Sequence, residues 1–243
     1  LHRVDRRQRQ MCIRDRYMIK VNAISIGKIE TLSYGNYKPM QSALNKIPFK
    51  GQMWLNRLGF VDDEQAYHNH GGIHKAICCF SKSNYQLFKD DLDQLPEFAM
   101  FGENLTVEHL DEADVYFGNQ YQLGDTIIEV SDIREPCWKI QAKYAIPNLV
   151  QKMSQSGKTG FYFRVIKEGY VHQSDNLKLI KKAESNTRLS VKDLNHLFYN
   201  ERNNLRLIYH ALRNPYLSPD RKKKLQKMKT RAENRKFIKS DDK

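Results

Sequence analysis

Residues 126–139 read Thr-Ile-Ile-Glu-Val-Ser-Asp-Ile-Arg-Glu-Pro-Cys-Trp-Lys. The first six residues are mostly β-branched and follow the turn pair Gly124-Asp125, which predicts a β-strand. Cys137 then lies in the loop after that strand, close to the cations Arg134 and Lys139. Nearby cations favour the thiolate form of a cysteine, and a thiolate is both a nucleophile and a metal ligand. A buried structural cysteine is the alternative interpretation, and this stretch alone leaves both open.

Two motifs lie upstream of this stretch. The first reads His70-Gly71-Gly72-Ile73-His74-Lys75-Ala76 and opens into an apolar run, and the second reads Phe101-Gly102-Glu103-Asn104-Leu105-Thr106. Together with the Cys137 loop, in this order and at these separations, they resemble the MOSC family, the sulfurase C-terminal domains that bind molybdenum cofactor. The resemblance is closest to the YiiM-like branch of that family, and it covers about residues 18–236.

Two more segments agree with that branch, one before the His-Gly-Gly motif and one after Cys137: Gly59-Phe60-Val61-Asp62-Asp63-Glu64-Gln65 and Ser156-Gly157-Lys158-Thr159-Gly160-Phe161-Tyr162. The chain also departs from the family pattern at two turns. The family usually has Gly where Asp62 stands, and it commonly has Gln-Pro where Asp132-Ile133 stand. The residues of the three main motifs are intact.

The resemblance implies an α+β fold, with a MOSC β-barrel-like domain followed by a small three-helix C-terminal domain. It also implies a molybdenum-cofactor-binding oxidoreductase that removes oxygen from N-hydroxylated compounds, such as the mutagenic base analogue 6-N-hydroxylaminopurine, and yields the amine and water. The chain has no Gly-x-Gly-x-x-Gly fingerprint after a strand and no cysteine cluster suited to iron and sulfur. A separate flavin or haem protein is therefore the expected electron donor.

The same resemblance assigns roles to the motif residues. Cys137 is the expected catalytic thiolate and molybdenum ligand, a role that soft sulfur suits. His70 is the second expected catalytic residue, which orients substrate, donates a proton or contacts the pterin. Arg134 and Lys139 are expected to keep the thiolate ionised and to meet the cofactor phosphate. The other expected cofactor-binding residues supply close backbone approach, charge or hydrogen-bonding groups: Gly71, Gly72, Lys75, Gly102, Glu103 and Asn104.

Each of these residues also has an ordinary structural interpretation. A lone histidine is commonly a satisfied core residue, and the glycines are compatible with two ordinary turns. The pair Glu103-Asn104 fits a β-turn that caps a strand. The sequence leaves these alternatives open.

Short apolar runs separated by Gly, Asn and Asp predict a β-rich domain over residues 18–182. Many short strands at uneven spacing favour a closed or half-closed barrel over a doubly wound sheet. Helices are expected over Ser83–Leu92 and Ile140–Met153, the second interrupted by Pro147. The expected strands are Lys20–Ile26, Ala76–Phe80, Leu105–Val107, Val115–Phe117, Thr126–Ser131 and Tyr162–Ile166.

Residues 183–243 change to helical periodicity and predict a basic three-helix C-terminal domain. Ser190 is a cap-like start for the first helix, and Ser218-Pro219 opens the third, which is rich in Lys and Arg. The second helix follows from apolar residues at helical spacing: Leu205, Ile208, Tyr209 and Leu212. Residues 1–17 lack periodicity and precede Met18, so they are expected to be an extraneous extension; a basic targeting peptide is the alternative.

The net charge of +13 is concentrated at the two ends of the 243-residue chain. Residues 1–17 carry +4 and residues 181–243 carry +11, which leaves −2 for residues 18–180, nearly all of the predicted barrel. The basic run Arg221-Lys222-Lys223-Lys224 is expected to be a solvated helix face; docking to an acidic redox partner or a nucleic acid is the alternative. No apolar run approaches the roughly 18–20 residues that span a bilayer, so a cytoplasmic protein is expected.

Four cysteines stand at positions 12, 78, 79 and 137, without disulfide-scaffold spacing. Cys78 and Cys79 lie in an apolar strand pattern and are expected to pack in the core. Three functions stay open: the reductase; a carrier that stores or delivers the cofactor, or transfers sulfur through a persulfide on Cys137; and a nucleic-acid-binding protein that uses the basic tail. The last is the least favoured, because the predicted barrel is not basic.

Overall fold

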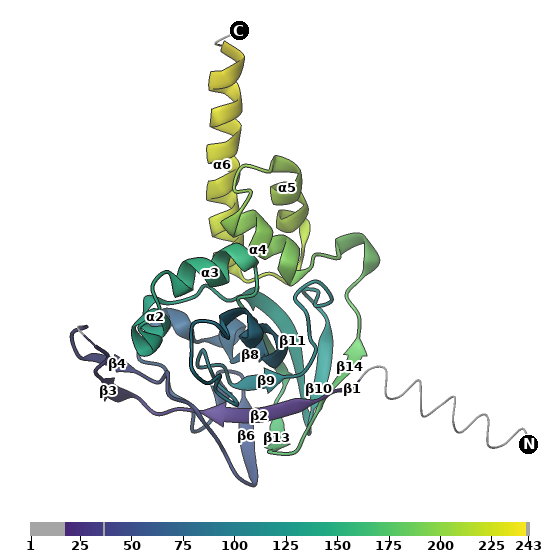
Figure 1. Cartoon of the computed structure of the whole chain (residues 1–243). Helices are drawn as coiled ribbons and strands as arrows, with labels where there is room; N and C mark the ends of the chain where they lie inside the picture. Colours follow the sequence, from purple (N-terminus) through teal and green to yellow (C-terminus); the bar gives the residue numbers. More distant parts are fainter. Residues whose placement is uncertain (1–17, 36, 242–243) are drawn as a thin grey trace, which may run out of the picture.

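The computed structural model describes residues 18–35 and 37–241, with side chains through residue 235. The predicted extension over residues 1–17 lies outside the described residues. A mixed nine-stranded sheet forms a half-barrel at the centre (Figure 1), and the expected α+β fold is confirmed. Its strands lie in the order β1 (Met18–Ile19), β14 (Leu177–Lys181), β10 (Gln120–Leu123), β11 (Thr126–Ile133), β12 (Phe161–Lys167), β8 (Ile77–Ser81), β9 (Leu105–Val107), β2 (Val21–Ile26) and β5 (Ile47–Pro48).

Strand β11 is the longest strand of this sheet and is almost entirely buried. It pairs antiparallel with β10 on one side and with β12 on the other, and β8 follows β12. The only parallel pair among the described strands is β8 with β9. Because β8 directly follows the His-Gly-Gly motif and β9 directly follows Asn104, this parallel pair brings the two upstream motifs to one end of the half-barrel.

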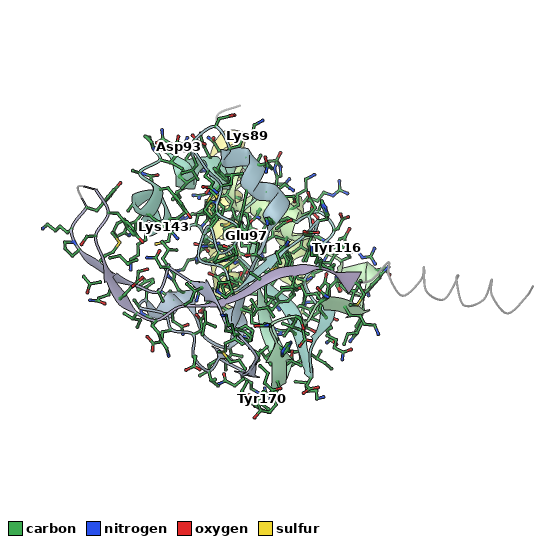
Figure 2. All side chains as sticks on the ribbon, turned by 60° about the horizontal axis from the view of Figure 1, so that its bottom comes forward. Lys89, Asp93, Glu97, Tyr116, Lys143 and Tyr170 are labelled. Carbon is green, nitrogen blue, oxygen red and sulfur yellow. The ribbon has the colours of Figure 1, made fainter. Side chains whose placement is uncertain are left out.

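Two smaller sheets flank the half-barrel. Strands β13 (Gly169–His172), β6 (Gln52–Asn56) and β7 (Gly59–Phe60) form one, and β3 (Glu30–Leu32) with β4 (Met40–Ser42) forms the other. Figure 2 shows Tyr170 of β13 at the rim of the molecule, where its ring meets that of Trp54 edge-on. The pattern of apolar runs missed these strands, together with β10 and β14, because they are short and rich in polar residues.

Two short helices follow the Cys137 loop, α2 (Trp138–Tyr144) and α3 (Leu149–Ser156). The interruption predicted at Pro147 is confirmed: Ala145 ends α2 with φ +51°, and α3 begins after the proline. The helix expected over Ser83–Leu92 is instead a 3₁₀ helix, η3 (Lys82–Phe88). Residues three apart eclipse in a 3₁₀ helix, which places Tyr85 and Phe88 together in one apolar cluster. The strand expected over residues 115–117 is wrong, since only Tyr116 forms a bridge, to Ser190.

Three C-terminal helices follow, as predicted: α4 (Val191–Tyr199), α5 (Leu205–Arg213) and α6 (Pro219–Asp241). α4 starts with a capping box, in which Ser190 Oγ accepts a 3.0 Å hydrogen bond from the Asp193 backbone and the Asp193 carboxylate accepts from the Ser190 backbone. α6 runs away from the half-barrel along α5 (Figure 1). None of the helices in the described residues is long and apolar enough to cross a bilayer.

One apolar core joins the half-barrel to these helices. It contains Val130 and Phe163 of the sheet together with Leu194, Ile208 and Leu225, one from each C-terminal helix. The division of the chain at residue 182 therefore stays a prediction. The expected solvated basic face is wrong at Arg221, which is only 2% exposed.

Candidate functional site

A polar pocket gathers the three motifs at one end of the half-barrel. Its walls come from the segment between β4 and β5, the segment after β7, the η1 (His68–His70) and η2 (Ile73–Lys75) turns, the loop before β9 and the loop after β11. The pocket brings together seven of the expected site residues: His70, Lys75, Gly102, Asn104, Arg134, Cys137 and Lys139.

Gly71, Gly72 and Glu103 do not line the pocket. Gly72 has φ +97°, a conformation that favours glycine, but a Cβ added there would meet nothing within 4 Å. A Cβ on Gly71 would collide with the side chain of Gln65, which does line the pocket. The two glycines therefore shape the turn beside the pocket and do not present backbone to it.

Glu103 is fully buried and is engaged by its own loop. Its carboxylate accepts hydrogen bonds from the Phe101 backbone at 3.0 Å, from Thr106 Oγ1 at 3.1 Å and from the Tyr85 hydroxyl. The expected use of Glu103 as a cofactor-binding residue does not fit this placement. The residue fixes the shape of the loop that carries Gly102, where φ is +74° and a Cβ would approach Leu44 Cδ1 to 2.6 Å.

The side-chain amide of Asn104 also forms its hydrogen bonds within the protein. Its oxygen accepts from the Cys78 backbone at 3.0 Å, and its nitrogen donates to the Ser25 carbonyl at 3.1 Å and to Asp63 at 2.8 Å. Asp63 in turn pairs with the nearly buried Lys46, and both line the pocket. Sequence reasoning did not single out this ion pair, although Asp63 belongs to a segment that agreed with the family.

Arg134 is the pocket residue best suited to bind an anion. Its side chain is 6% exposed, and one terminal nitrogen, Nη2, donates to the Phe101 carbonyl. The other terminal nitrogen, Nη1, is buried and has no hydrogen-bond partner among the described residues. An unpartnered, buried guanidinium N–H is costly, whereas an anion at the same place would make a charge-assisted hydrogen bond. The pocket therefore fits an anionic group at Arg134.

Two lysines extend the positive field, and their charges act on His70. Lys75 Nζ donates to the Asn69 carbonyl at 2.8 Å, and Lys139 Nζ donates to the Gln41 carbonyl at 2.6 Å. The imidazole of His70 remains accessible at the pocket, yet desolvation by surrounding atoms, followed by the charges of Arg134, Lys139 and Lys75, lowers its pKa to about 4. His70 is therefore neutral near pH 7 in the ligand-free protein.

Cys137 is a half-buried free thiol on the pocket wall, at the residue before α2. Cys79 is fully buried in the core, as expected, and lies outside the pocket lining. Cys78 differs from the expectation of pure packing, because it also lines the pocket; burial raises the pKa of its thiol to about 11, against the influence of Arg134. In the described part of the chain, no group of three or more His, Cys, Asp or Glu is arranged to hold a metal ion.

Tyr162 of β12 is a further pocket residue that the sequence did not reveal. Its ring lies 5.7 Å from Lys75 Nζ, and burial raises the pKa of its hydroxyl. Its strand neighbours are Cys78 on β8 and Asp132 on β11. The pocket thus combines cationic donors, a neutral imidazole, a phenol and one accessible thiol, a set suited to an anionic ligand that carries a soft metal.

Comparison with known proteins identifies the family of this chain. The MOSC domain model matches residues 66–178. The uncharacterized protein YflK of Bacillus subtilis is 36% identical over 212 residues, 87% of this chain and 95% of YflK. Protein YiiM of Escherichia coli is 34% identical over 165 residues, 66% of this chain and 72% of YiiM. A protein of Gibberella moniliformis named "Reductase" is 26% identical over 163 residues, 65% of this chain but 29% of that protein.

A solved structure agrees as well. The crystal structure of YiiM from Geobacillus stearothermophilus superposes with a TM-score of 0.73 at 28% identity, and the match covers 87% of this chain and 99% of that one. It therefore spans the half-barrel and the C-terminal helices alike. On the shared fold, the matched domain and the extent of these alignments, the chain belongs to the MOSC-domain family, among its YiiM-like members.

Proposed function

We propose that the pocket binds molybdenum cofactor and that the chain is an oxidoreductase which reduces N-hydroxylated compounds, such as 6-N-hydroxylaminopurine, to the amine. MOSC domains are associated with molybdenum cofactor in general, and one relative of this chain is named a reductase. The reaction breaks the N–O bond, consumes two electrons and two protons, and releases water. Electrons come from a separate flavin or haem protein.

The observation that carries the proposal is the buried, unpartnered Nη1 of Arg134 in the same pocket as the Cys137 thiol. Molybdenum cofactor is a phosphorylated pterin dithiolene, so it needs both an anion site and room for a soft ligand. Arg134 supplies the first and Cys137 the second. Lys75 and Lys139 add positive charge at the pocket wall.

When bound, the cofactor supplies the two-electron oxygen-atom transfer. The chain has four other tasks. Arg134 holds the phosphate, and Cys137 provides a thiolate ligand. His70, which is neutral near pH 7, offers one N–H donor and one acceptor nitrogen with which to orient the N-hydroxyl group. The loop around Gly102, fixed by Glu103, closes the pocket on the Leu44 side.

The alternative function is a cofactor carrier, or a sulfur-transfer protein with a persulfide on Cys137. The same pocket and the same thiol would serve it, so the distinction is turnover. A carrier would hold molybdenum and pterin but would not reduce an N-hydroxylated substrate with a chemical electron donor.

The test is to purify the protein from a host that makes the cofactor, to measure molybdenum and pterin, and to assay hydroxylaminopurine reduction with a reduced viologen dye. We expect bound cofactor and turnover in the unmodified chain, and loss of turnover in Cys137→Ala. The matched control is Cys79→Ala, because Cys79 is equally a thiol but lies outside the pocket lining. Each variant must keep the melting profile of the unmodified chain, since unfolding also abolishes activity.

A fully active Cys137→Ala protein would refute the ligand role. Protein that lacks molybdenum and pterin, even though its host loads other molybdoenzymes, would refute the cofactor assignment. Bound cofactor without turnover would favour the carrier.

A further inference from the structure

The loop that carries Cys137 is held from outside the half-barrel. Four consecutive residues before it, Asp132 to Glu135, all contact the C-terminal helices or the turn between them. At Asp132, Oδ1 accepts from Arg221 Nε at 2.6 Å, and Oδ2 accepts from Ser218 Oγ at 3.1 Å. The Ile133 carbonyl accepts from Arg221 Nη2 at 3.3 Å.

The next two residues continue this pattern. The Arg134 carbonyl accepts from the hydroxyl of Tyr199 on α4 at 3.4 Å. Glu135 forms ion pairs with Arg221 at 2.8 Å and with Lys224 at 2.6 Å. Beyond Glu135 the chain turns through Pro136 and reaches Cys137, so the held segment ends two residues before the thiol.

Arg221 is the centre of this arrangement. Its side chain is 2% exposed, its guanidinium carbon lies 4.5 Å from the ring centre of Phe198, and it contacts three of the four held residues. Breaking a buried, paired charge of this kind is strongly unfavourable, so the arrangement resists opening.

Glu135 shows why the arrangement also matters to the pocket. It lines the pocket that holds Arg134, where a free carboxylate would repel an anionic ligand. The ion pairs with Arg221 and Lys224 place two cations beside the Glu135 carboxylate and offset its negative charge. The same contacts thus fix the loop and protect the positive field.

We infer that Arg221 is a positioning residue: with Asp132 and Glu135 it clamps the loop that presents Cys137 and Arg134 to the pocket. The clamp is a property of the folded chain, and its importance for catalysis rests on the proposed function. Arg221 does not line the pocket, so it acts through the loop and not on a ligand.

The test measures the loop directly, in ligand-free, full-length protein. Iodoacetamide alkylation of Cys137 is followed by mass spectrometry of its peptide, in the unmodified chain and in Arg221→Lys, which keeps the charge but cannot reach both carboxylates. We expect alkylation to be at least about tenfold faster in the variant, equivalent to about 1.4 kcal/mol of loop-closing free energy.

The matched control is Arg164→Lys. Arg164 is also a mostly buried arginine that pairs with a buried carboxylate, Glu129, and also reaches the C-terminal part, at the Tyr216 carbonyl. It makes no contact with residues 132–135. A merely structural arginine at 221 would behave like Arg164, so equal alkylation rates in the two variants, whether both fast or both slow, would overturn the inference.

A second variant guards against misfolding. If Arg221→Lys does not fold, as judged by circular dichroism, Asp132→Asn removes one charge of the pair while it keeps the side-chain shape and a group that can accept from Ser218. It should also accelerate alkylation of Cys137, and an unchanged rate would overturn the inference. A chain that never carries molybdenum would refute the proposed function and leave this result intact.

Discussion

Replacing Arg134 by Met should separate ligand binding from stability. The variant removes a buried charge that has no acidic partner within salt-bridge distance among the described residues, which relieves a desolvation cost. Apolar replacement of a whole buried ion pair is often neutral or stabilising by about 1–4 kcal/mol, and we take the same range for a buried charge without an acidic partner, whose desolvation cost is likewise relieved. Loss of the bond to the Phe101 carbonyl opposes this by about 1–3 kcal/mol. The free energy of unfolding should therefore change by less than about 3 kcal/mol in either direction.

Anion affinity should change much more. Inorganic phosphate stands in for the cofactor phosphate, and the variant loses at least one charge-assisted hydrogen bond to it. Such a bond is worth about 1.5–3 kcal/mol, which corresponds to roughly 10- to 150-fold weaker binding. Isothermal titration calorimetry at low ionic strength measures the affinity, and urea unfolding measures the stability.

Arg221→Met is the matched control, because Arg221 is equally buried but forms ion pairs with two carboxylates, those of Asp132 and Glu135. Removing one partner of a buried ion pair costs about 3–5 kcal/mol. The control should thus lose far more stability than Arg134→Met. If Arg134→Met lost more than about 3 kcal/mol and bound phosphate normally, Arg134 would be a structural arginine and the pocket would not be an anion site.

Three further predictions concern the pocket and the tail. The imidazole of His70 should titrate near pH 4 in NMR spectra of the ligand-free protein. Because an unfolded chain takes up that proton near pH 6.5, the free energy of unfolding should fall as pH drops from 6.5 to 4. His70→Gln should reduce this slope. A pKa near 6.5 in the folded protein would contradict the assigned charges. Gly72→Val should lower the free energy of unfolding by about 1–3 kcal/mol, because φ at this residue is +97°. It should leave bound molybdenum unchanged, because a Cβ at residue 72 meets no atom within 4 Å. Cofactor loss at unchanged stability would reverse this conclusion. Exchanging the exposed Lys227 and Arg231 of α6 for Gln should slow turnover with an acidic protein reductase but not with a chemical electron donor. Added salt should have the same effect on the unmodified chain, since the screening length is about 8 Å at physiological ionic strength. Salt-independent turnover with the reductase would argue against docking.

The half-barrel and the pocket were partly predictable from the sequence, for identifiable reasons. The strand before Cys137 was clear because Ile127, Ile128 and Val130 form a dense β-branched run, and the capping box at Ser190 marked α4 by local chemistry alone. The short strand β10 was missed, because Gln-Tyr-Gln-Leu carries only two apolar residues, and its burial depends on pairing with β11.

Roles that depend on distant partners were the ones the sequence could not show. Glu103 stands beside Asn104 in the motif, yet its carboxylate turns inward to Tyr85, a residue eighteen positions earlier. Arg221 has the sequence context of a solvated lysine-rich helix, and its burial depends on contacts with distant residues such as Asp132 on β11. The sequence shows which residues are charged, whereas the partners of each charge, and therefore its role, depend on the tertiary structure.

The ion pair between Asp132 and Arg221 joins residues 89 positions apart, and this separation sets an order of events during synthesis. At about 5–20 residues per second, roughly 4–18 s pass between the addition of Asp132 and that of Arg221 to the growing chain. During that interval the strand ahead of Cys137 exists without its partner from α6. The pocket of a nascent half-barrel therefore lacks its outer support, and we expect ligand loading to follow the addition of Arg221 to the growing chain.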